Sequence, residues 1–164
     1  MLESLFWVIL TGGLPVLFSY AYMYNYSDVS DLWGKLENCM YLSWVISVAL
    51  TVLSYGYLFW FFIYKNTMYE SILCAIYVIF LSSAAQWAFF AIIDVKDKKK
   101  SSFLLVNLII TALATAGLLV MTVLIGIREG WDIYNVLALV GACIMVLHHA
   151  VFDAIVWYSG FLEK

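Results

Sequence analysis

Five long stretches without a charged residue constrain the fold of this chain more than any other feature. They cover residues 4–27, 38–64, 71–93, 101–127 and 133–152. An α-helix rises ~1.5 Å per residue, so about 20 apolar residues cross the ~30 Å hydrocarbon layer of a bilayer. Each stretch is long enough to cross once, and the chain is predicted to be an all-α integral membrane protein, a bundle of five transmembrane helices.

The composition agrees with that prediction. Of the 164 residues, 66% are hydrophobic and only 12% are charged, which is more apolar material than a water-soluble domain of this size can bury. We expect a single transmembrane domain over residues 1–164, with helices near 5–24, 39–64, 68–93, 101–127 and 131–160. A separate soluble catalytic domain and a nucleic-acid-binding module, which needs a basic face, are both excluded.

The basic residues predict how the chain is oriented. With five spans, Lys35, Lys96, the run 98–100 and Lys164 share one face, whereas Lys65 and Arg128 lie on the other. Because positive charge is retained on the cytoplasmic side, the multi-pass chain is expected to have its N-terminus outside and its C-terminus in the cytoplasm.

Polar side chains from several helices are predicted to lie at one depth. At ~1.5 Å per residue from the cytoplasmic helix ends, Trp44, Gln86 and Asn107 lie about 9–12 Å deep. His148 and His149 lie about 6–8 Å from the same border. Such residues are costly in hydrocarbon and mark functional positions or helix contacts. The other half of the fifth helix has no polar residue between Asn135 and His148, which argues against a continuous water path.

The pair of residues that most specifically indicates a chemical role is His149 and Asp153. They are four residues apart and share a helix face, so the carboxylate can stabilise an imidazolium, exchange a proton with the ring or orient it as a ligand. A buried pair that only satisfies its own hydrogen bonds, with no functional role, fits the spacing equally well. The neighbours His148 and His149 are expected to point about 100° apart, so no metal site is predicted beyond haem ligation by His149.

Tryptophans accompany the polar set. Trp33, Trp44, Trp87 and Trp157 lie on the cytoplasmic side, where flat indoles around a few polar groups suit a large planar or polycyclic ligand. Alternatively, they anchor the helices at the membrane interface, as the remaining tryptophans do. Alanines at four-residue spacing permit close helix contacts, within the bundle or in a homodimer.

Four short segments of the chain resemble the translocator protein family, also called the tryptophan-rich sensory proteins. They are residues 33–36 (WGKL), 55–60 (YGYLFW), 86–90 (QWAFF) and 153–157 (DAIVW). The family's K-P-x-W-x-P-P motif is absent, and Asp153 stands where the family has Asn. The resemblance implies a binder of tetrapyrroles, sterols or similar lipophiles, with Trp33, Trp87, Asp153 and Trp157 lining the pocket.

The leading hypothesis is therefore a non-enzymatic membrane binder or transporter of a lipophilic or polycyclic ligand, with porphyrin or haem as the candidate cofactor. The predicted ligand-binding residues are Trp33, Trp44, Gln86, Trp87, Asn107, His148, His149, Asp153 and Trp157.

Two alternatives stay open. One is a small oligomeric ion or proton channel or carrier that uses His148, His149 and Asp153. The other is an accessory subunit of a larger membrane complex. Enzymatic activity is the least favoured class, and no catalytic residues are predicted, because no set of nucleophile, base and oxyanion donors can be assembled. The expected partners are the lipid bilayer, a lipophilic small molecule and a second copy or a membrane-complex subunit, but no nucleic acid.

Overall fold

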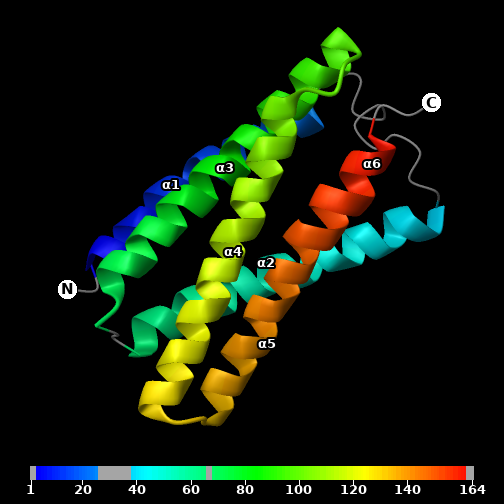
Figure 1. The fold of residues 1–164 in the computed structure, drawn as a ribbon. Helices are drawn as coiled ribbons and strands as arrows, with labels where there is room; N and C mark the ends of the chain where they lie inside the picture. Colours follow the sequence, from blue (N-terminus) through cyan, green and yellow to red (C-terminus); the bar gives the residue numbers. More distant parts are fainter. Residues whose placement is uncertain (1–2, 26–37, 66–67, 162–164) are drawn as a thin grey trace.

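The computed structural model describes residues 3–25, 38–65 and 68–161, and five long helices account for nearly all of them (Figure 1). They are α1 (Glu3–Tyr24), α2 (Asn38–Lys65), α3 (Glu70–Asp97), α4 (Ser102–Glu129) and a last rod made of α5 (Ile133–Leu147), η2 (His148–Trp157) and α6 (Tyr158–Gly160). All five are long and apolar enough to cross a membrane, which confirms the predicted all-α membrane architecture.

Charged and polar residues near the helix ends set the boundaries. Ser101 and Asp132 precede α4 and α5, and their side chains accept hydrogen bonds from the backbone N–H of Leu104 and Asn135. The third helix was expected to stop at Ile93, but it continues to Asp97. The carboxylate of Asp94 is buried there because it accepts hydrogen bonds from Ser101 N at 2.8 Å and Ser101 Oγ at 3.1 Å.

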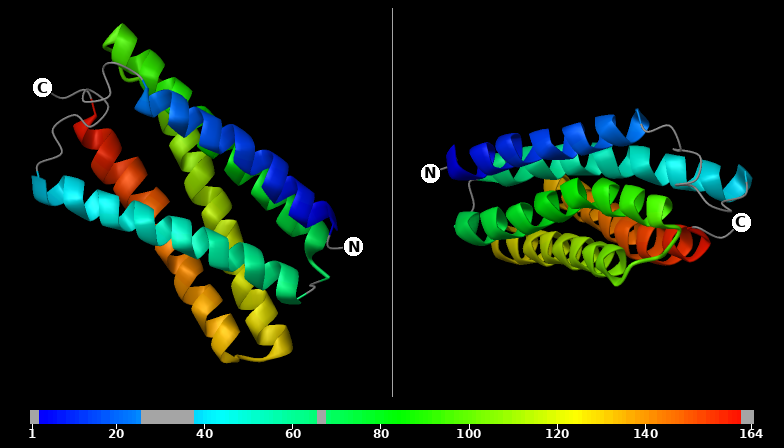
Figure 2. Two further views of the ribbon diagram at one scale, coloured as in Figure 1. Left: turned by 180° about the vertical axis from the view of Figure 1, so that it is seen from behind. Right: turned by 90° about the horizontal axis from the view of Figure 1, so that it is seen from above.

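The helices pack in an order that differs from their order in the sequence. α1 packs mainly on α3, α3 on α4, α4 on α5, and α2 on α5 and η2. Seen from above, α1 and α2 lie on one side of the layer formed by α3, α4 and the last rod (Figure 2). We call the end that carries Lys96 and residues 98–100 the lysine end, and the end that carries Arg128 the opposite end.

Two apolar cores occupy the two halves of the bundle. The core toward the opposite end contains Leu58, Phe61, Tyr77, Phe80 and Met145 among others. The core toward the lysine end is formed by residues from all five helices, including Met23, Trp44, Trp87, Leu108 and Trp157. Lipid-facing Leu, Ile, Val and Phe side chains surround both cores, as the composition predicts for a protein in a bilayer.

Close contact between α1 and α3 depends on a glycine. A Cβ atom at Gly12 would lie 2.7 Å from Cδ1 and 3.3 Å from Cβ of Leu81, whereas a Cβ at the neighbouring Gly13 would meet nothing within 4 Å. A larger side chain at Gly12 must therefore separate the two helices or displace Leu81.

We predict that Gly12→Leu lowers the free energy of unfolding by about 1–3 kcal/mol, the usual cost of overpacking. Gly13→Leu gains the same helix propensity without a clash and should be as stable as wild type or slightly more so. The free energies of unfolding of the two variants and wild type can be compared in a detergent titration that is monitored by tryptophan fluorescence. Equal stability of the two variants would show that α1 does not pack on α3 through this surface.

An ion pair joins α2 to the start of α5 at the opposite end. Lys65 Nζ donates to Asp132 Oδ2 at 3.0 Å, and Glu129 Oε2 lies 3.8 Å from the same nitrogen. The hydrogen bond from the backbone N–H of Asn135 and the one from Lys65 lower the pKa of Asp132 below its ordinary value of 3.8. A carboxyl group with a lowered pKa stabilises the fold above its ordinary pKa and loses that effect as the pH falls through the lowered value.

Wild type should therefore melt at a higher temperature than Asp132→Asn near pH 6, and the difference should shrink as the pH falls below the ordinary pKa of 3.8. The asparagine keeps the oxygen that caps α5 and removes only the charge. Melting temperatures of both proteins between about pH 2.5 and pH 7 test this sign. A difference that stays constant over that range would exclude a contribution from the charge.

Candidate functional site

A cluster of three ionisable side chains lies inside the bundle on η2. His149 Nδ1 is 2.9 Å from Asp153 Oδ2, and His148 Nε2 is 3.4 Å from the same oxygen. The side chains of His148, His149 and Asp153 are 6%, 11% and 12% exposed. Two imidazoles thus converge on one carboxylate oxygen in a segment that crosses the membrane.

Helix α2 contributes two further polar side chains to the cluster. Trp44 Nε1–H donates to Asp153 Oδ1 at 3.1 Å, so both carboxylate oxygens have partners. Ser47 Oγ lies 2.9 Å from His148 Nδ1 and 2.7 Å from the backbone oxygen of Trp44. The two residues are three apart and face η2 from adjacent turns, which ties α2 to the last rod.

The backbone of η2 explains why both histidines reach Asp153. Residues His148–Trp157 form a π-helix, in which backbone hydrogen bonds join residues five apart. Residues at i+4 and i+5 therefore share a face, which brings His149 and His148 to the same carboxylate. The two histidines were expected to diverge as adjacent residues of an α-helix do; in the π-helix both nevertheless lie beside the same carboxylate oxygen.

The two apolar cores meet at this cluster. Trp44 belongs to the core toward the lysine end, whereas Phe80, which belongs to the other core, contacts the His149 ring edge to face with centroids 5.5 Å apart. Nε2 of His149 is buried and has no hydrogen-bond partner within the described part of the chain. The cluster is polar toward α2 and apolar toward α3.

The same three side chains offer a metal two imidazole nitrogens and one carboxylate oxygen, and these atoms lie within 4.8 Å of one another. Two ligands of one ion with bonds of ~2.1 Å can be at most about 4.2 Å apart. The donor atoms lie close to that limit, so the three side chains are a candidate metal site. A proton can be shared at the present distances.

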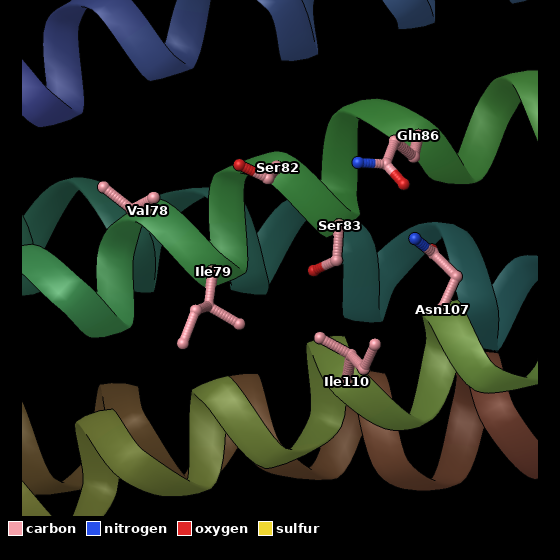
Figure 3. Close-up of a pocket in the computed structure, with 7 residues that line it drawn as sticks. All are labelled: Val78, Ile79, Ser82, Ser83, Gln86, Asn107 and Ile110. Carbon is pink, nitrogen blue, oxygen red and sulfur yellow. The ribbon is translucent and has the colours of Figure 1, made fainter.

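Gln86 and Asn107, two of the predicted site residues, lie apart from the His–Asp cluster. They line a groove of about 250 Å³ between α3 and α4, together with Val78, Ile79, Ser82, Ser83 and Ile110 (Figure 3). Gln86 is exposed, whereas Asn107 is buried and its Oδ1 has no hydrogen-bond partner among the described residues. None of the groove residues belongs to the His–Asp cluster, so the structure does not bring these two amides to it.

The tryptophans that were predicted to share one site lie in different places. Trp87 and Trp157 pack against each other with ring centroids 5.2 Å apart, and both are buried in the core toward the lysine end. Tyr20 stacks on Trp87, and Phe161 stacks on Trp157. Trp44 contacts the His–Asp cluster. Trp33 lies outside the described residues.

Two residues of the site, Ser47 and Phe80, were not predicted. Ser47 lies three residues after Trp44 on α2, at the depth of the cluster, and a search for hydroxyl groups at that depth could have found it. Phe80 carries no such signal, because a phenylalanine in an apolar helix is indistinguishable from its neighbours until the helices are packed.

Comparison with known proteins gives no relative: no family model, no curated protein and no solved structure matches the chain. The resemblance to the translocator protein family therefore stays a prediction.

We predict that Trp44→Phe lowers the free energy of unfolding by about 1.5–3 kcal/mol, the usual cost of removing a hydrogen bond to a buried charged group. Trp60→Phe makes the same change at a residue that is 43% exposed and should have little effect. Thermal or detergent unfolding of both variants measures the difference. Equal losses would show that the bond to Asp153 contributes nothing beyond ring packing.

Proposed function

We propose that this chain is a small proton carrier or channel of the membrane, in which His148, His149 and Asp153 bind and release the transported proton. The proposal selects one of the alternatives that the sequence leaves open, because the three residues converge on one carboxylate oxygen inside the bundle.

The main support for the proposal is the direction of the hydrogen bonds that Ser47 and His148 make. A serine hydroxyl has one hydrogen, and we assign that of Ser47 to the backbone oxygen of Trp44, which at 2.7 Å is nearer than His148 Nδ1 at 2.9 Å. Ser47 Oγ can then only accept from His148 Nδ1, which must carry a hydrogen. In a neutral ring His148 Nε2 is consequently a bare acceptor, and it faces Asp153 Oδ2, another acceptor, at 3.4 Å.

Two lone pairs do not attract, so this arrangement requires one proton on His148 Nε2 or on Asp153 Oδ2. His149 supplies a second site, because its Nδ1 lies 2.9 Å from Oδ2 and its Nε2 has no partner among the residues that the structure describes. The cluster can therefore hold one proton between His148 and Asp153 and receive another at His149. Intramembrane carboxylate and histidine groups arranged in this way are typical of proton relays.

The lipophile-binding hypothesis has less support from the geometry. Ligand pockets usually enclose ~300–1,000 Å³, and the groove at Gln86 and Asn107 is smaller, at about 250 Å³. Trp87 and Trp157, expected as pocket walls, fill the space between them with their own rings. A role as a subunit of a larger complex has no specific observation in its favour.

Purified protein in liposomes that contain a pH-sensitive dye should dissipate an imposed proton gradient. Asp153→Asn keeps the size of the side chain but cannot exchange a proton, so the rate should fall by at least about tenfold, as expected for the loss of an acid–base group. His148→Gln and His149→Gln should each lower it by a smaller factor.

Asp94→Asn is the matched control. Asp94 is also a buried carboxylate, but it only accepts hydrogen bonds from Ser101, and its variant should keep the wild-type rate. Flux by Asp153→Asn at the wild-type rate, or no flux above that of protein-free liposomes, would overturn the proposal. Purified protein that retains stoichiometric zinc lost in Asp153→Asn would assign the cluster to a metal instead.

A further inference from the structure

Buried polar atoms without a partner lie in the half of the bundle between the His–Asp cluster and the opposite end. Among the residues that the structure describes they are Thr51 Oγ1, Tyr55 OH, Tyr77 OH, Glu70 Oε1 and Asn135 Oδ1, and they follow the unpartnered His149 Nε2. Thr51 is 7% exposed and Tyr77 is fully buried. Asn135 lies in the first turn of α5, and the fifth helix has no polar side chain between it and His148, so the other four groups come from α2 and α3.

Helix spacing puts these groups on two facing stripes. Ser47, Thr51 and Tyr55 follow one another at intervals of four residues on α2 and share a face. Tyr77 lies two turns after Glu70 on α3, and Glu70 is in the first turn of that helix at the opposite end. The stripe on α2 thus begins at the cluster, and the stripe on α3 begins at the membrane surface.

Ring contacts connect the two stripes to the cluster. The ring of Tyr55 lies 6.0 Å from that of Tyr77 and 5.9 Å from that of Phe80, and Phe80 lies 5.5 Å from His149. Phe80 is thus the side chain that contacts both the tyrosine of α2 and the histidine of the cluster. Its ring is apolar and nearly buried, at 6% exposed.

A buried hydroxyl without a partner costs free energy, and native proteins avoid this cost by placing ordered water beside such groups. One such atom in a bundle is unremarkable. The four on α2 and α3, on stripes that meet at Tyr55 and Tyr77, indicate a common column of water. Glu70 at the surface gives that column a charged entrance.

We propose that Glu70, Tyr77, Tyr55 and Thr51 line a water column that leads protons from the opposite end to His149, and that the ring of Phe80 closes its inner end. This path rests on the proposed function. When the Phe80 ring turns aside, a water in the column gives a proton to His149 Nε2, and the ring becomes an imidazolium whose Nδ1–H donates to Asp153 Oδ2 at 2.9 Å.

Flux measurements test the two parts of the path. The double variant Tyr55→Phe, Tyr77→Phe keeps both rings and removes both hydroxyls, and it should lower the proton flux several-fold. Phe80→Ala removes the barrier and should raise the flux. Phe89→Ala changes a phenylalanine of α3 that is 48% exposed, and it should leave the flux at the wild-type rate.

The reactivity of a native cysteine thiol can reveal water in the column without a transport measurement. Cys74 lies four residues after Glu70 and three before Tyr77, on the stripe of α3. Only a hydrated thiol ionises readily to the reactive thiolate. With Cys39 and Cys143 replaced by Ser, aqueous silver ions should modify Cys74 roughly tenfold faster than the thiol of Ile72→Cys in a cysteine-free protein. Ile72 is on the same helix and 52% exposed.

The outcomes separate the two proposals. Slow modification of Cys74, or unchanged flux in the double tyrosine variant, overturns the path alone if Asp153→Asn still lowers the proton flux strongly. Absence of flux in wild type overturns the proposed function and the path together. Fast modification of Cys74, low flux without the tyrosine hydroxyls and high flux in Phe80→Ala support the path.

Discussion

The carboxylate of Asp153 in the middle of an apolar bundle is the constraint on which the arrangement of the last rod and α2 depends. A charged side chain in an apolar membrane helix is costly unless it finds partners. Here the indole of Trp44 and two imidazoles surround it. Because Trp44 comes from α2, the need to satisfy one carboxylate also fixes where α2 crosses the last rod.

The π-helical backbone of η2 makes this solvation possible. In an α-helix, at 3.6 residues per turn, His148 and Asp153 would be about 140° apart and could not meet. The wider turn brings His148 Nε2 within 3.4 Å of Asp153 Oδ2 while its other nitrogen keeps Ser47. π-helical turns are rare and occur often at functional sites. The geometric cost of the turn is thus offset by a second imidazole at the carboxylate.

Much of the fold could be predicted from the sequence, because the number of spans depends only on where charges interrupt apolar residues. The pairing of His149 with Asp153 was also predictable, since four residues separate them in any helix. Depth along the membrane placed Trp44 near the cluster correctly but could not exclude Gln86 and Asn107. Two residues at one depth can face different helices, and only packing shows that these amides line the groove between α3 and α4.

The half of the proposed path toward the opposite end illustrates a second limit of sequence analysis. Polar residues are absent from the fifth helix between Asn135 and His148, and this absence argued against a water path. That argument assumed that one helix must line the whole route. In the packed bundle, α2 and α3 supply hydroxyls from Thr51, Tyr55 and Tyr77, residues that hydropathy counts as ordinary parts of apolar spans. A tyrosine in a membrane helix is apolar by its ring and a proton donor and acceptor by its hydroxyl. Which property matters depends on where the hydroxyl is buried, and that is decided by the neighbouring helix.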